Sequence, residues 1–169
     1  MFDASREKPV FAGEEEGQFL LHRNLMGMIR ASISSPLFQT MYFKQNGEAV
    51  DVLENGNLSC AVYVSSLLYL HGLLKEQHTW VSTTIADLKE SGWKDITTQR
   101  PGGVIVWGPW EHSTHKHIGF SLGGNLAVSN VDTKRSPQEH HATYGENDDG
   151  SPKRPIEAVY WHPKFEEEK

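Results

Sequence analysis

Cysteine is nearly absent from this chain: Cys60 is the only one in 169 residues. A single thiol cannot form an internal disulfide, so the sequence has no disulfide framework, and nothing in its cysteine usage requires an oxidising compartment. A domain of about 150 residues buries roughly 68–70% of its unfolded surface, so a core can form without a disulfide or a metal. The lone thiol is therefore either an inert core group or a reactive group.

The chain also lacks long apolar runs and an excess of basic residues. No stretch approaches the roughly 18 apolar residues that suggest a membrane span. Residues 1–9 lack the basic start and apolar core of a signal peptide. The formal net charge is −6, whereas a nucleic-acid binder usually presents a basic face. We expect no membrane span and no nucleic-acid partner, and a cytoplasmic location by default.

Apolar periodicity predicts helices in the first half of the chain and strands in the second. A flexible leader (1–13), one domain (14–165) and an acidic tail (166–169) are expected. Asn46-Gly47 is a strong hairpin signal, and the Thr84/Asp87 spacing resembles a capping box. The expected helices are 15–34, 60–72 and 84–91, and the expected strands are 37–44, 48–53, 104–107, 117–122, 125–130 and 156–161. This order predicts an α+β fold with an antiparallel sheet.

Cys60 lies where the second predicted helix begins. This helix is apolar nearly all round, so we expect it at the centre of the domain. Backbone N–H groups and the positive end of the dipole at a helix N-terminus stabilise a thiolate, the nucleophilic form of cysteine. The placement favours a chemical role, although a free cysteine alone is more often a small buried hydrophobe.

A cysteine nucleophile needs a base, and the base needs a third group that fixes its tautomer. His117 opens a predicted strand that leads into Gly123-Gly124. If those two glycines form a two-residue turn, His117 lies directly opposite Asn130 on the next strand. A slip of one residue would present Ser129 or Val131 instead, because it reverses the faces of the strand. Asn130 is thus the predicted third member, and Ser129 the alternative.

These residues stand in segments that resemble a known superfamily. The segments Leu-Ser-Cys-Ala-Val-Tyr-Val (58–64), Arg-Pro-Gly-Gly-Val-Ile-Val-Trp (100–107) and His-Ile-Gly-Phe-Ser-Leu-Gly (117–123) look like the NlpC-type papain-like cysteine peptidases. The match covers about residues 55–130, and its order of Cys before His also resembles the related CHAP amidases. The chain departs from the common pattern after the cysteine, where Ala61-Val62 stands, and after Pro101-Gly102, where Gly103 stands.

The resemblance implies a papain-like α+β fold and a hydrolase for an amide bond, commonly in peptidoglycan stem peptides. In that pattern Cys60 matches the nucleophile, His117 the base and Asn130 the polar third residue, acting through a thioester without a cofactor. The expected partner is a peptide or a peptidoglycan fragment. Since such enzymes mostly act outside the cytoplasm, release to the cell wall by another route stays open.

Further residues are expected to line the cleft and contact the substrate. Arg135 is a candidate for binding an anionic group, since a guanidinium matches a carboxylate bidentately. Tyr42 and Tyr63 are alternative second donors to the carbonyl oxygen, beside the backbone N–H of Cys60. The expected substrate-binding residues are Ser59, Tyr63, Trp107, His115, Ser129 and Arg135.

Two histidine groups have plainer interpretations. A His-x-x-His-x-His cluster is formed by His112, His115 and His117, and imidazoles at such positions can bind a transition metal. No cysteine or carboxylate at ligand spacing accompanies the cluster, so we expect a polar loop. His140-His141 would be an alternative base or a contact for a substrate carboxylate; a surface loop is the expected structure.

Two other functions fit the same residues. A catalytically silent papain-like module would bind a peptide or partner protein through the same groove. An acyltransferase would keep the Cys-His pair and pass the thioester to an amine instead of water.

Overall fold

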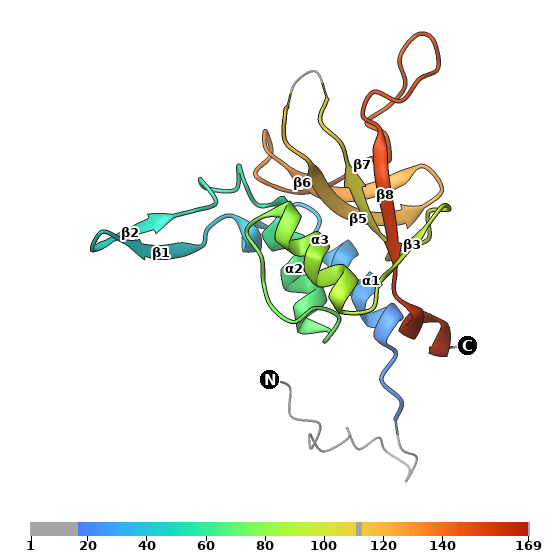
Figure 1. Ribbon diagram of the computed structural model, residues 1–169, viewed down its shortest axis with the longest axis horizontal. Coiled ribbons are helices and arrows are strands. Elements are labelled where there is room, and N and C mark those ends of the chain that lie inside the picture. The colour runs from blue at the N-terminus through green and yellow to red at the C-terminus, as the bar shows by residue number, and fades with distance from the viewer. Residues whose placement is uncertain (1–16, 111–112, 169) are drawn as a thin grey trace.

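The computed structural model describes residues 17–110 and 113–168 (Figure 1). The leader predicted over residues 1–13 and His112 of the histidine cluster lie outside these ranges. The elements in chain order are α1 (Leu21–Ala31), η1 (Pro36–Phe38), β1 (Tyr42–Gln45), β2 (Glu48–Asp51), α2 (Cys60–Leu70), α3 (Val81–Glu90), β3 (Lys94–Ile96), β4 (Val104–Trp107), β5 (His117–Gly123), β6 (Leu126–Val131), β7 (Ser136–His141), β8 (Ile156–Trp161) and η2 (Pro163–Glu168).

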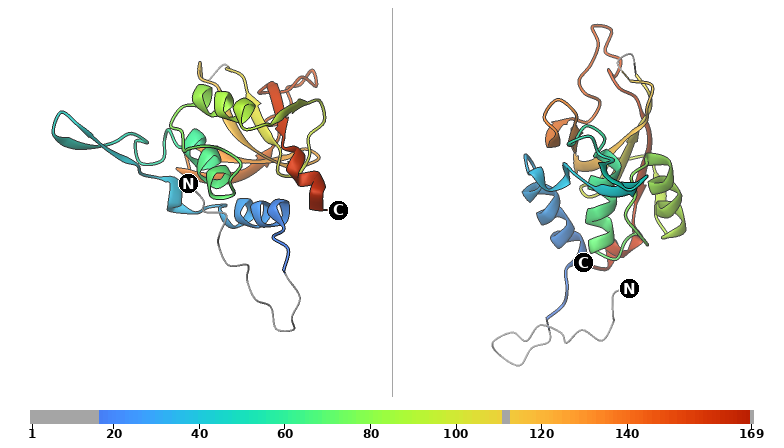
Figure 2. Two further views of the ribbon diagram at one scale, coloured as in Figure 1. Left: turned by 60° about the horizontal axis from the view of Figure 1, so that its bottom comes forward. Right: turned by 90° about the vertical axis from the view of Figure 1, so that its left-hand side faces the viewer.

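Six of the strands form one antiparallel sheet in the order β3-β8-β4-β5-β6-β7. The strands β1 and β2 pair separately as a hairpin that projects from the body (Figures 1 and 2). The prediction of an α+β fold with an antiparallel sheet is therefore confirmed. Its hairpin signal is confirmed too, because Asn46 and Gly47 form the turn with positive φ angles of 51° and 90°.

The main core lies between the helices and one face of the sheet. Helix α2 lies between α1 and α3 in Figure 2, and eight of its eleven residues are buried. Alternation on the strands supplies the sheet side of this core, with Val104 and Val106 from β4 and Ile118 and Phe120 from β5. Burial of α2 explains why its sequence is apolar on every side.

A second, smaller core covers the opposite face of the sheet. It contains Ile105, Trp107, Ala127 and Ala142, with Tyr144 and Ile156 packed against them. Because Trp107 faces His117 in the β4–β5 register, His117 points to this second face. The two faces of the sheet therefore carry different parts of the site.

Several predicted boundaries are wrong. The first helix covers only Leu21–Ala31, and η1 stands where a strand was expected to begin at residue 37. The capping box is absent: α3 begins at Val81, and Thr84 donates instead to the Trp80 carbonyl at 2.9 Å. The predictions also omitted β3 and β7.

The β5–β6 turn differs from the prediction in a way that matters for the site. Gly123 pairs with Leu126, so Gly124-Asn125 forms the turn, one residue later than predicted. A bulge between Ser121 and Gly123 then shifts the register again, and Gly119 faces Ser129. Continued to the start of β5, this register differs by one residue from the predicted one. A one-residue difference exchanges the faces of β6, so Ser129 and not Asn130 shares a face with His117.

The C-terminal residues pack onto the first helix. The Glu168 carboxylate accepts hydrogen bonds from the backbone N–H groups of His22 and Arg23, and Glu166 pairs with Arg100 at 2.6 Å. Residues 166–168, expected as a separate tail, thus belong to η2 and contact the domain. Within the described residues, no helix is both long and apolar enough to cross a membrane.

Candidate active site

Cys60 is the first residue of α2, as the sequence predicts. Cys60 as a whole residue is half-buried, whereas the next eight residues of the helix are buried and hold its start against the sheet. The backbone N–H of Ile118, beside His117 on β5, hydrogen-bonds toward the sulfur and favours the thiolate. The fold therefore brings the thiol to the strand that carries the predicted base.

The thiol is nevertheless protonated at neutral pH. Burial raises the pKa of Cys60, and this effect outweighs the opposing backbone N–H groups of Ile118 and Ala61 and the positive charge of Arg154. The sequence predicts a stabilised thiolate because it shows the helix N-terminus, which lowers the pKa. It does not show the burial, which raises the pKa by more. A nucleophilic role for Cys60 would therefore require a base that takes its proton.

His117, next to Ile118 on β5, is the candidate base, and Ser129 holds its ring. The Nε2 atom of His117 lies 2.9 Å from the Oγ atom of Ser129 on β6. Within the described part of the chain, no hydrogen bond occupies the other ring nitrogen, Nδ1, and none joins the thiol directly to the imidazole. The arrangement leaves Nδ1 as the atom that can serve as base.

The predicted pairing of His117 with Asn130 is wrong. Asn130 points to the opposite face of β6, where its Nδ2 donates to the Gly56 carbonyl at 2.8 Å. Its Oδ1 is buried without a hydrogen-bond partner among the described residues. Asn130 therefore fixes the loop that leads into Cys60, and the alternative residue, Ser129, occupies the position beside His117.

Ser129 joins three ring side chains. Its Oγ atom lies 2.7 Å from His140 Nε2 and 3.0 Å from the Tyr144 hydroxyl, in addition to His117. The rings of His140 and Tyr144 stack with centroids 4.2 Å apart. His140 comes from the edge strand β7, so three adjacent strands and the following turn assemble one polar cluster.

The cluster is enclosed by aromatic rings and one guanidinium. Trp107 is fully buried, with its ring 5.6 Å from both His117 and His140. Arg154 lies over the rings of Trp110 and Tyr144 and donates to the carbonyls of Gly108 and His115 at 3.0 and 2.9 Å.

This enclosure sets the protonation of His117. Burial, followed by the positive charge of Arg154 and the proximity of His140, lowers the pKa of His117 to about 3. His117 is therefore neutral at physiological pH. Together with the protonated thiol, it gives a neutral resting pair and not a thiolate–imidazolium ion pair.

Four of the six residues expected to contact substrate are fully buried, and three of these, Ser59, Tyr63 and Trp107, belong to the framework. Ser59 has no exposed surface, and its hydroxyl lacks a hydrogen-bond partner among the described residues. Tyr63 packs in the main core and bonds Ser32 at 2.9 Å, which also removes it as a donor to a carbonyl oxygen. Trp107 donates to the Ala142 carbonyl at 2.6 Å. These side chains cannot reach a substrate without unfolding the core.

The other three residues expected to contact substrate differ in their exposure and in their partners. Ser129 is fully buried and holds His117, so it does not face a substrate. His115 is exposed, and its backbone carbonyl anchors Arg154. Arg135 is exposed in the β6–β7 turn, where its backbone lies against Gly56 in the loop before Cys60. Tyr42, the other suggested oxyanion donor, is 64% exposed on the projecting hairpin.

Sequence reasoning missed the residues that surround His117. His140 lies on β7 and not in a surface loop, and Tyr144 and Arg154 lie outside every helix and strand that the sequence predicts. The segment Ser136–His141 contains a proline and no apolar alternation, so it carries no strand signal. The one available signal was the adjacent pair His140-His141, for which a surface loop was expected.

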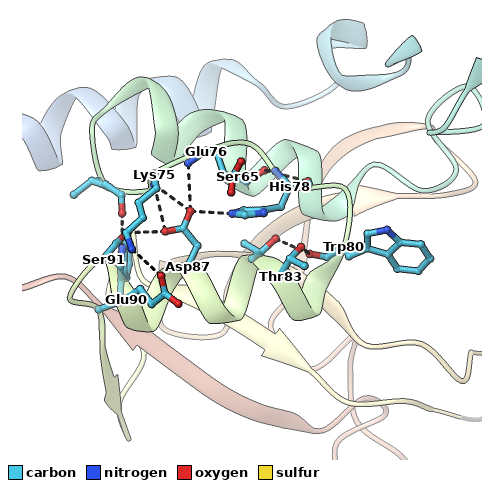
Figure 3. A network of polar contacts seen from close by, with 12 residues as sticks. Ser65, Lys75, Glu76, His78, Trp80, Thr83, Asp87, Glu90 and Ser91 are labelled. Atoms are coloured by element: carbon cyan, nitrogen blue, oxygen red, sulfur yellow. Dashed lines mark hydrogen bonds and ion pairs between the residues drawn. The ribbon is translucent and has the colours of Figure 1, made fainter. Parts of the chain in front are cut away.

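A second polar cluster, around Asp87 of α3, contains serine, histidine and aspartate (Figure 3). His78 Nε2 lies 2.8 Å from the Asp87 carboxylate. Ser65, however, bonds the backbone N–H and carbonyl of His78 and not its ring. Among the residues that the structure describes, no hydroxyl bonds the His78 imidazole, so this cluster is not arranged as a nucleophilic triad. It instead fastens the α2–α3 connection to α3.

Comparison with known proteins adds no assignment to this geometry. The sequence matches no family model and no curated protein.

Proposed function

We propose that the protein is a cysteine hydrolase that cleaves a peptide or amide bond, with Cys60 as nucleophile and His117 as base. One observation carries the proposal: Cys60 begins α2 beside the Ile118 backbone, and the adjacent His117 is held through Nε2 by Ser129. A nucleophile, a base and a group that orients the base are the parts that such a reaction needs.

The reaction follows from the neutral resting pair. The Cys60 sulfur attacks the substrate carbonyl carbon while its proton passes to His117 Nδ1, and the carbonyl oxygen becomes an oxyanion. The backbone N–H of Cys60 at the helix start is the candidate donor to that oxyanion. His117 then protonates the amine as the carbon–nitrogen bond breaks, which leaves a thioester on Cys60.

Water completes the cycle. His117 takes a proton from the water as its oxygen attacks the thioester carbon. The carbon–sulfur bond breaks, and the proton returns from His117 to the sulfur. The products are a carboxylic acid and an amine, and the protein returns to its starting state. The resemblance to NlpC-type and CHAP enzymes makes peptidoglycan stem peptides the first substrates to test and a papain-like fold the proposed fold family.

The test is turnover of stem peptides and of peptidoglycan fragments, followed by mass spectrometry of the products. Cys60→Ala should abolish turnover without altering the thermal unfolding midpoint by more than a few degrees. His117→Ala should abolish it as well. A mass increase of the intact protein equal to the acyl group, present in the wild type and absent in Cys60→Ala, would identify the thioester. Turnover that survives in Cys60→Ala would contradict the proposal.

The same assay separates hydrolysis from acyl transfer. With an added amine acceptor, a transferase gives a new amide, whereas a hydrolase gives the carboxylic acid. If the ratio of amide to carboxylic acid rises with the amine concentration, the thioester passes to the amine and the protein is an acyltransferase.

One observation favours a second function, a catalytically silent binding module. Burial moves the pKa of Cys60 up and that of His117 down, away from the ion pair that many cysteine enzymes use. A silent module would bind peptide with the same affinity in the wild type and in Cys60→Ala. It would also show no turnover in either.

A further inference from the structure

We propose that His140 is a positioning residue that acts through the Ser129 hydroxyl to keep the proton of neutral His117 on Nε2. This leaves Nδ1 free to accept the thiol proton of Cys60. The inference rests on the proposed function for its purpose, but the hydrogen-bond directions on which it depends are independent of any substrate.

Hydrogen bonds run from His117 through Ser129 to His140, and the direction of donation along them is set at His140. The Nδ1 atom of His140 lies 2.8 Å from the carbonyl oxygen of His141. A carbonyl oxygen can only accept, so His140 carries a proton on Nδ1 and donates it. Burial lowers the pKa of His140, which keeps the ring neutral. A neutral imidazole has one proton, so Nε2 of His140 is an acceptor.

Ser129 transmits this direction to His117. A hydroxyl has one proton to donate and two lone pairs to accept with. His140 Nε2, at 2.7 Å, must receive the Ser129 proton. The Ser129 oxygen then accepts from both remaining partners, His117 Nε2 at 2.9 Å and the Tyr144 hydroxyl at 3.0 Å. His117 therefore holds its proton on Nε2, and its Nδ1 carries a lone pair.

Neighbouring aromatic rings hold these hydrogen-bonded side chains in place. Tyr144 stacks on His140 at 4.2 Å between centroids, and Trp107 packs near both histidine rings. Ser129 has no exposed surface, so water does not compete for its lone pairs. The same bonds persist when His117 is protonated, since an imidazolium also donates from Nε2. These hydrogen bonds are therefore compatible with both the neutral and the protonated form of His117.

Without an acceptor at residue 140, the Ser129 hydroxyl is free to turn. It can then donate to His117 Nε2, which moves the proton of neutral His117 to Nδ1 and removes the lone pair that the proposed proton transfer from Cys60 needs. A histidine in the wrong tautomer cannot act as base, and in a well-studied serine protease triad this loss costs about 10⁴-fold in kcat. We expect a fall of at least about tenfold in kcat for a His140 variant that lacks the acceptor, with little change in KM.

Two variants separate the acceptor from the bulk of the ring. His140→Leu removes the acceptor and keeps most of the volume. In His140→Gln, the side-chain oxygen can accept the Ser129 proton near the position of Nε2. His71→Ala is the control, because that ring bonds the Leu67 carbonyl at the far end of α2.

The readout is nitrogen-15 NMR of the histidine rings near pH 7, which distinguishes the two neutral tautomers without a substrate. The His117 and His140 signals are assigned by their loss in His117→Ala and His140→Gln. We expect the Nε2–H tautomer for His117 and the Nδ1–H tautomer for His140 in the wild type. His117 should change tautomer in His140→Leu and keep the wild-type tautomer in His140→Gln and His71→Ala.

Two results would overturn the proposal: a wild-type His117 protonated on Nδ1, or a His117 tautomer unchanged in His140→Leu. The wild-type spectrum decides the first even if a variant fails to fold. The expected tautomers in a protein without turnover would sustain the positioning role and reject the hydrolase. Turnover in the wild type with no tautomer change in His140→Leu would sustain the hydrolase and reject the positioning role.

Discussion

The Nε2 atom of His117 lies 2.9 Å from the Oγ atom of Ser129, on the neighbouring strand of the sheet. The two residues are diagonal neighbours on one face, while Asn130 faces the other. The group that orients the candidate base is thus a hydroxyl, and a hydroxyl takes its direction from its other partners.

Replacing Ser129 with alanine should therefore lower kcat more than it raises KM. The variant leaves His117 Nε2, His140 Nε2 and the Tyr144 hydroxyl without their shared partner. Each buried polar group left unpaired costs about 1–3 kcal/mol, so the unfolding midpoint should also fall. Steady-state kinetics and thermal unfolding on the same preparation check both expectations.

Asn130→Ala is the matched comparison for Ser129→Ala. It removes a bond to the Gly56 carbonyl, on the opposite face of the same strand. We expect a loss of stability of about 1 kcal/mol and a smaller fall in kcat than in Ser129→Ala. If Asn130→Ala had the larger effect on kcat, Ser129 would not be the residue that orients His117.

The sequence predicted the part of the fold that depends on local patterns. The apolar helix with Cys60 at its start, the Asn46-Gly47 hairpin and the strand at His117 all have the predicted type, because periodicity and turn chemistry act within a few residues. The antiparallel arrangement followed from the order of those elements.

The rest of the site depends on details that no local pattern contains. A turn displaced by one residue and a bulge near Leu122 together exchanged Asn130 for Ser129. Strand β7 forms by pairing with β6 and not by its own propensity. Its histidine reaches the site only through that pairing, so local patterns alone placed His140 in a loop.

Gly119 offers a test of how tightly the site is packed. A Cβ atom there would lie 2.5 Å from the Val128 carbonyl oxygen, 2.7 Å from Ser129 Cβ and 3.0 Å from the Trp107 ring. Overpacking of this kind typically costs about 1–3 kcal/mol. It would also push Ser129 away from His117. Gly119→Ala should therefore lose both stability and activity, as measured by denaturant unfolding and kinetics.

Gly27→Ala is the control for this substitution. Gly27 lies within α1, and a Cβ atom there would meet nothing within 4 Å. Alanine is favoured over glycine inside a helix by about 1 kcal/mol, so this variant should be more stable and equally active. Equal effects of the two substitutions on activity would show that crowding beside Ser129 is not the cause.

The Asp87 cluster predicts a pH-dependent contribution to stability. Burial alone would raise the pKa of Asp87, but hydrogen bonds from His78, Ser91 and the backbone N–H groups of Glu76 and Lys75 together lower it. A carboxyl with a lowered folded pKa stabilises the fold above the unfolded value of about 3.9, and this contribution is lost as pH falls through the folded pKa. Acid thus weakens the connection between α2 and α3 (Figure 3).

Asp87→Asn measures that contribution. Hydrogen bonds to a charged group are worth about 1.5–3 kcal/mol, so the variant should be less stable by about this amount at pH 7. The difference from the wild type should shrink below about pH 4, where the wild-type carboxylate is protonated in the unfolded chain. Urea unfolding at a series of pH values checks this. A difference that stayed constant down to about pH 2 would mean that the charge of Asp87 plays no part.

The reactivity of Cys60 toward iodoacetamide between about pH 5 and 9 reports how much of the thiol is ionised. Only the thiolate reacts, and an unperturbed thiol has a pKa of about 8.5. Burial raises the pKa of Cys60, and burial lowers that of His117 to about 3. The alkylation rate of the free protein should therefore be low at pH 6 and still rising at pH 9. Intact mass makes the assignment unambiguous, since the chain has one cysteine.

The His117→Ala variant decides how this rate profile is interpreted. In a neutral resting pair, His117 contributes no positive charge, so its removal should leave the rate at pH 6 nearly unchanged. In an ion pair, the imidazolium would hold the thiolate, so the wild type would react rapidly at pH 6 and the variant slowly. Rapid wild-type labelling that disappears in His117→Ala would overturn the neutral pair. It would also mean that the thiol proton already resides on His117 before substrate binds, which moves the first proton transfer out of the attack step.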